Sequence, residues 1–142
     1  MKNIFKVDQT LGVSKFRFYL LRVYYIVIIL MLGIEVWTNI FTHKGMWDPL
    51  PAVAFSFWGA FTVLAILGIL HPLKMVPLLL VQFSYKLIWL IILGYPLWTA
   101  NRIEGFSAEL TKANLIGVVL DLLIIPWPYV FKNYILIRKK NK

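Results

Sequence analysis

Four long apolar stretches, separated by short polar segments, make up most of the sequence. They cover residues 18–38, 52–70, 75–98 and 114–134. Each stretch is long enough to cross the hydrocarbon core of a bilayer as a helix, which takes about 20 residues. The apolar residues run on without the period-two alternation of membrane strands, and a backbone in lipid must satisfy its own hydrogen bonds. The pattern therefore predicts an all-α integral membrane protein, a bundle of four transmembrane helices.

The prolines and the polar segments add local detail to this pattern. Pro126 and Pro128 lie inside the fourth stretch and should kink it or end it early, because proline lacks the N–H that a helix interior needs. In the preceding polar segment, Ser107 is a candidate N-cap of a short interfacial helix. We see no internal repeat, linker or second domain, so we expect a single domain over residues 1–142.

Composition strengthens the membrane interpretation and excludes several classes of function. Hydrophobic residues make up 61 % of the chain, charged residues 15 %, and the mean hydropathy is +0.77. A soluble domain needs roughly a quarter of charged residues to cover its surface. The chain has no cysteine, which excludes disulfides, thiolate metal sites and a cysteine nucleophile. With only two histidines and no glycine-rich phosphate loop, we expect neither a metal site nor a cofactor.

The net charge of +9 is distributed as a topology signal. Basic residues gather in the N-terminal segment, in the C-terminal tail and at Lys74, whereas the other two loops mix Lys44 with Asp48 and Arg102 with Glu104. By the positive-inside rule, both termini face the cytoplasm, where the basic ends meet anionic lipid. We expect no nucleic-acid binding, and a multi-pass location in a bacterial inner membrane.

Three ionisable residues, Glu35, Lys86 and Asp121, lie inside the apolar stretches. A charge near the bilayer centre costs at least ~2.5–3.5 kcal/mol on insertion scales and is usually paired or functional. Counting along each helix from its cytoplasmic end, at about 1.5 Å per residue, places the three charges in one layer. We expect Lys86 to pair with Glu35, with Asp121 or with both, inside the bundle.

The helical faces agree with a shared polar interior. Gln82, Lys86 and Trp89 fall on one stripe of the third helix with Tyr85 at its border, and Asn114, Gly117 and Asp121 fall on one stripe of the fourth. We assign no catalytic residue. The predicted residues for ligand or ion binding are Glu35, Gln82, Tyr85, Lys86, Trp89, Asn114 and Asp121.

Two interpretations of this charge set remain open, a structural ion cluster that fixes helix register and a site for a bound species. We expect a small membrane protein that binds or conducts a proton, an ion or a small amphipathic ligand. An accessory role in a homo-oligomer or a larger membrane complex is also open. The alternative is a membrane-embedded enzyme acting on a lipid-soluble substrate, with Glu35 and Asp121 as acid–base groups. A closed, fully hydrogen-bonded cluster would favour the structural role.

Overall fold

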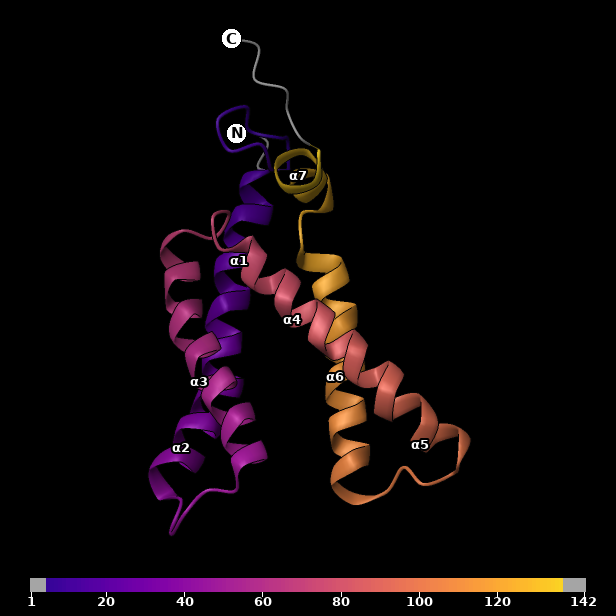
Figure 1. Ribbon diagram of the computed structural model, residues 1–142. Helices are drawn as coiled ribbons and strands as arrows, with labels where there is room; N and C mark the ends of the chain where they lie inside the picture. Colours follow the sequence, from indigo (N-terminus) through magenta and orange to yellow (C-terminus); the bar gives the residue numbers. More distant parts are fainter. Residues whose placement is uncertain (1–4, 137–142) are drawn as a thin grey trace. The chain divides into compact units, whose positions relative to one another are not determined.

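The computed structural model describes residues 5–136, and most of these residues are helical, with no strand among them (Figure 1). Contacts divide the chain into two compact units, Met1–Leu78 and Leu79–Lys142. The elements are α1 (Lys15–Ile28), the π-helical turn η1 (Ile29–Gly33), α2 (Ile34–Thr42), α3 (Pro49–Leu70), α4 (Val76–Trp89), the π-helical turn η2 (Leu90–Gly94), α5 (Tyr95–Thr99), α6 (Gly105–Ile124), α7 (Trp127–Val130) and the π-helical turn η3 (Phe131–Ile135). The expected single domain stays a prediction.

Three helices are long and apolar enough to cross a membrane, namely Lys15–Thr42, Pro49–Leu70 and Val76–Thr99. A fourth crossing is present if α6 and the segment Trp127–Ile135, which are bent by 71° from each other, count as one span. Large apolar side chains are widely exposed, as the surface of a membrane protein requires when lipid covers it. The all-helical class is therefore confirmed, with three to four helices that are long and apolar enough to span a membrane, while the count of four and the orientation of the termini stay predictions.

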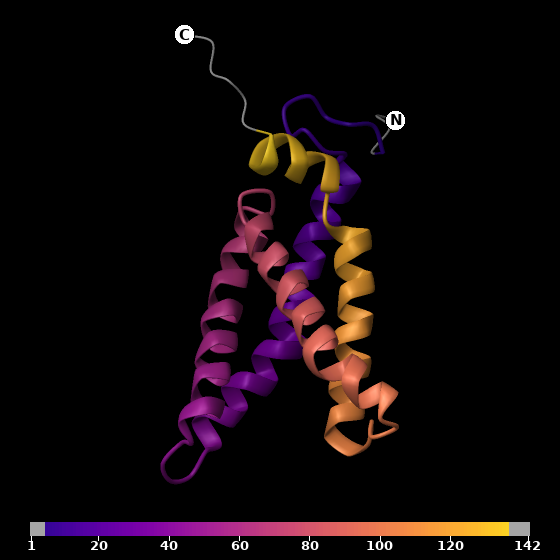
Figure 2. The same ribbon diagram turned by 45° about the vertical axis from the view of Figure 1, so that its right-hand side comes forward.

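The fourth predicted span differs most from its observed form. Its helix, α6, begins at Gly105 rather than at residue 114, so the expected short interfacial helix and the start of the span are one element. Ser107 is not the N-cap. That position belongs to Glu104, whose backbone N–H donates to Ser107 Oγ at 3.3 Å. The helix ends before Pro126, as expected of a residue without an N–H, and Figure 2 shows the chain turning there into α7.

In the first unit, α1 and α3 lie side by side and meet at a glycine (Figure 1). The ring of Tyr25 lies directly against Gly68, where an added Cβ would overlap it. The Tyr25 hydroxyl donates to the backbone oxygen of Pro72 at 3.4 Å, and the side chain is fully buried. This contact joins α1 to the end of α3 through a ring on a glycine and a phenol on a backbone oxygen.

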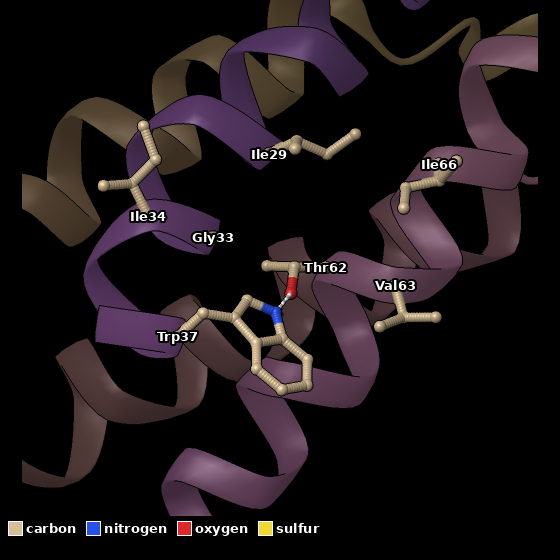
Figure 3. A pocket seen from close by; sticks show the side chains of 7 residues that line it. All are labelled: Ile29, Gly33, Ile34, Trp37, Thr62, Val63 and Ile66. Carbon is tan, nitrogen blue, oxygen red and sulfur yellow. Dashed lines mark hydrogen bonds between the residues drawn. The ribbon is translucent and has the colours of Figure 1, made fainter. Parts of the chain in front are cut away.

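Away from this contact, toward the N-terminal end of α3, the helix packs against η1 and α2. The indole Nε1 of Trp37 donates to Thr62 Oγ1 at 3.1 Å, and Thr62 Oγ1 donates to the Gly59 carbonyl at 2.8 Å. Beside this bond lies a pocket of about 300 Å³, walled mainly by aliphatic side chains such as Ile29 and Ile66 (Figure 3). Thr62, a polar residue within an apolar helix, is thus hydrogen-bonded within the helix pair.

Candidate polar site of the second unit

A buried ion pair joins α4 and α6. The ammonium of Lys86 lies 3.5 Å from Asp121 Oδ2. The Asp121 side chain is 0 % exposed and the Lys86 side chain 12 %, so the carboxylate is enclosed and the lysine reaches it from the edge. The expected pairing of Lys86 with Asp121 is therefore observed.

Gln82 is the second partner of this carboxylate. Its Nε2 donates to Asp121 Oδ1 at 3.0 Å and approaches Oδ2 at 3.3 Å. Gln82 lies one helical turn before Lys86 on α4 and is itself buried. Because the amide contact at 3.0 Å is shorter than the ammonium contact at 3.5 Å, Gln82 holds the carboxylate more closely than Lys86 does.

The stripe on α6 brings a glycine to the point where Lys86 crosses the helix. Asn114, Gly117 and Asp121 are all buried, which agrees with their predicted common face. A Cβ at Gly117 would overlap Nζ, Cε and Cδ of Lys86. The lysine stem therefore lies directly on the α6 backbone at Gly117, and a larger residue there would require the flexible stem to shift.

Tyr85 and Trp89, the other predicted site residues of α4, differ in how close they lie to the ion pair. Tyr85 is half-buried and close enough to Asp121 for the two to interact electrostatically. Trp89 is also half-buried, and its ring lies near Gly94 of its own helical segment. Tyr85 thus borders the site, and the structure gives Trp89 a neighbour one turn farther along the chain.

Glu35 belongs to the first unit, in the first turn of α2. Its side chain is exposed, and its backbone oxygen accepts a hydrogen bond from Asn39 Nδ2 at 2.8 Å. The predicted grouping of Glu35 with Lys86 and Asp121 stays a prediction. The ion pair itself is built entirely from residues of the second unit.

Two further observations define what the site can do. Among residues 5–136, no three His, Asp or Glu side chains are grouped as metal ligands would be. The described cluster instead offers one carboxylate, one ammonium and one amide in an apolar surrounding. Such a set can hold a charge or donate hydrogen bonds to an oxygen atom. The low polarity of the surroundings makes these interactions stronger than they would be in water.

Comparison with known proteins found no matching family model, no matching curated protein and no matching solved structure. The role of the site therefore has to follow from its own residues. Sequence reasoning identified Gln82, Lys86 and Asp121 as candidates, but it missed the contact of Tyr25 with Gly68. An aromatic residue and a glycine in two apolar stretches gave no signal that they meet.

Proposed function

We propose that this chain is a small four-span protein of a bacterial inner membrane, with both termini in the cytoplasm. Its second unit binds the oxygen-bearing head of a small amphipathic ligand at Lys86. The spans are the three long helices and the bent pair α6 with Trp127–Ile135. Lys15 and Arg17 at the start of α1, and Lys74 between α3 and α4, support the orientation.

The ligand proposal rests on the different lengths of two contacts to the Asp121 carboxylate, 3.0 Å from Gln82 and 3.5 Å from Lys86. Gln82 donates to both carboxylate oxygens, so the carboxylate keeps a partner if Lys86 moves away. A lysine ammonium has three N–H donors, and the acceptor that the described residues give it is Asp121 Oδ2, at 3.5 Å. Lys86 is therefore the group that can exchange its partner for a ligand oxygen.

The position of Lys86 makes the exchange physically reasonable. Its ammonium is at the end of a flexible four-carbon stem, and its side chain is partly exposed at the helix surface. In the first unit the corresponding contact is made by an uncharged side chain, since the Tyr25 ring lies on Gly68 and its hydroxyl donates to a backbone oxygen. A charge that packing does not require, in an apolar layer where it is costly, is best explained by binding.

The enclosed carboxylate is the feature that favours the structural interpretation. Asp121 is fully buried and hydrogen-bonded, as a register-fixing cluster would be. In the ligand-free protein, Asp121 would then hold Lys86 in place. The broad exposed apolar surface is also compatible with a homo-oligomer or a larger membrane complex.

The function is tested by ligand titration of the purified protein in a neutral detergent, with dodecanoate as the probe. Dodecyltrimethylammonium, which has the same chain and a cationic head, is the control ligand. We expect dodecanoate to bind in preference to the cation. Because a hydrogen bond to a charged group contributes about 1.5–3 kcal/mol, Lys86→Met should weaken binding by roughly tenfold to a hundredfold.

Two variants separate binding from folding in this experiment. Lys86→Arg keeps a cationic donor and should retain most of the affinity. The pair Lys86→Met with Asp121→Asn leaves no unpaired buried charge, so it should keep its thermal stability and still lose dodecanoate binding. Equal affinity for dodecanoate in the wild type and in this stable double variant would disprove the ligand role of Lys86.

A further inference from the structure

The two π-helical turns η1 and η2 share a common plan. Each is five residues long, each ends at a buried glycine, Gly33 or Gly94, and each is followed four residues later by a tryptophan, Trp37 or Trp98. The two glycines are 61 residues apart in the sequence, and so are the two tryptophans. A π-helical turn inside an α-helix is rare, so two of them with the same length, the same terminal glycine and the same following tryptophan form a specific coincidence.

Two constant spacings relate the two glycine contacts, 61 residues for the first helix of each pair and 49 residues for the second helix, where Gly68 corresponds to Gly117. Tyr25 and Lys86 are also 61 residues apart, and each lies directly on a glycine of the following long helix, Gly68 or Gly117. Each then bonds to the residue four positions after that glycine. Tyr25 donates to the Pro72 carbonyl at 3.4 Å, and Lys86 approaches the Asp121 carboxylate at 3.5 Å.

Neighbouring positions follow this correspondence. Leu21 and Gln82, one turn before the contact residue, are both buried, and Tyr24 corresponds to Tyr85. On the second helix of each pair, the buried Ala65 corresponds to the buried Asn114. The corresponding glycines of the π-helical turns differ in their contacts, because the atoms nearest to Gly33 belong to Thr62 of the partner helix, whereas the atoms nearest to Gly94 belong to Leu90 and Trp89 of its own segment.

We propose that the chain is an internal duplication of one helical hairpin, and that its polar site arose in the second copy at three contact positions. Gln82, Lys86 and Asp121 stand where the first copy has Leu21, Tyr25 and Pro72. These three residues would then be the specificity-determining set of the second hairpin. The duplication holds whatever the site binds, so it goes beyond the function proposed above.

The proposal predicts that a tyrosine can replace Lys86 without loss of the hairpin. The test variant combines Lys86→Tyr with Asp121→Asn, which removes both charges and leaves an amide oxygen to accept from the phenol. Its melting temperature in detergent should lie within about 3 °C of the wild-type value. The matched control, Lys86→Ala with Asp121→Asn, leaves the surface of Gly117 uncovered and should melt at least about 5 °C lower.

A second measurement uses the glycine under the new ring. In the tyrosine variant, Gly117→Ala should lower the melting temperature as much as Gly68→Ala does in the wild type, because a rigid ring then lies on each glycine. In the wild type, Gly117→Ala should do less, since a lysine stem can move aside. A tyrosine variant that melts as low as the alanine control, or that tolerates Gly117→Ala as well as the wild type does, overturns the duplication.

The readouts keep the two proposals apart. Both melting experiments are carried out without ligand, so they report on the equivalence of the hairpins alone. A stable tyrosine variant that still binds dodecanoate with wild-type affinity would contradict the proposed function and leave the duplication intact. An unstable tyrosine variant, beside a stable Lys86→Met, Asp121→Asn variant that has lost binding, would contradict the duplication and leave the function intact.

Discussion

The stem of Lys86 lies against the backbone of α6 at Gly117, and this contact helps to place its charge. Gly117 lets the four-carbon stem lie flat on α6, so that the ammonium reaches Asp121 one turn farther along the helix. Gln82 then supplies the shorter contact to the same carboxylate. Position 117 thus controls the geometry of the ion pair although glycine has no functional group.

Three glycines allow this reasoning to be tested as a series. A Cβ at Gly68 would overlap a tyrosine ring, one at Gly117 would overlap a flexible lysine, and one at Gly59 would meet its neighbours at ordinary distances of 3.5 Å and beyond. We expect Gly68→Ala to destabilise by about 1–3 kcal/mol, Gly117→Ala by less and Gly59→Ala least. Thermal unfolding in detergent measures the order. An equal loss at all three positions would contradict it.

At this scale the sequence allowed the ion pair to be predicted, because a charge in an apolar stretch must find a partner and Lys86 and Asp121 lie on polar stripes. The same reasoning did not separate Glu35 from the pair. The depth of each charge in the membrane was counted along a straight, regular α-helix. Glu35, however, lies two residues after the end of the π-helical turn η1. Its exposed position depends on local packing that hydropathy does not contain.

Among the helices, α6 shows most clearly how its residues set its limits. It begins where Glu104 and Ser107 bond to each other's backbone and side-chain groups, and it stops before Pro126. Pro128 then lies in the first turn of α7, where a missing N–H is tolerated. The 71° bend between the two helices therefore follows from proline chemistry.

Removing both prolines should let the helix continue. We expect the combined Pro126→Ala and Pro128→Ala variant to straighten the segment from α6 to Ile135, since a proline in a helix interior costs about 3 kcal/mol and alanine does not. Spin labels at Leu115 and Asn133 would then be about 27 Å apart along a straight helix at 1.5 Å per residue, and nearer to each other in the parent protein. An unchanged distance would mean that packing, and not proline, bends the chain.

The cores of the helices were predictable from the sequence, and their ends were not. Apolar stretches fixed the middle of every long helix, because lipid requires an apolar surface over about 20 residues. The start of α6 lies among polar residues, Glu104 and Ser107, that hydropathy assigns to a loop. A helix can extend through such residues once a capping arrangement satisfies its first N–H groups.

For the molecule as a whole, orientation in the membrane is the property that charge should decide. We expect a cysteine at Gly45 or Arg102 to react with an impermeant thiol reagent added outside cells, because the proposed topology places both loops on the external side. A cysteine at Lys74 or Asn141 should react only after the cells are permeabilised. The native chain contains no cysteine, so each label reports a single position.

Two outcomes of the labelling would change the topology. Labelling at Asn141 from outside, with Lys74 protected, would mean that the bent pair crosses the membrane differently from a full span and that three spans are present. Labelling of Lys74 from outside, with Gly45 protected, would reverse the orientation. Asn141 lies outside the described residues, so this experiment adds a position that the structure does not describe.

At the scale of the whole chain, the sequence predicted the class of protein but not its internal plan. Identical residues at the 61-residue spacing are few, among them Gly33 with Gly94 and Trp37 with Trp98, and apolar residues replace one another freely in lipid-facing helices. The correspondence became visible through contacts, with Tyr25 on Gly68 and Lys86 on Gly117. A contact between distant helices leaves no periodic signal in a single sequence.

The π-helical turns also carry information about the order of events in the history of the chain. A turn closed by i→i+5 hydrogen bonds holds one residue more than an α-helical turn, so each one records an insertion that the helix absorbed. If the two hairpins descend from one, the insertion that ends at Gly33 and Gly94 came first, because both copies have it. The difference between Lys86 with Asp121 and Tyr25 with Pro72 then arose later, in a hairpin that already had the π-helical turn, so that a contact to a backbone oxygen in one copy corresponds to an ion pair in the other.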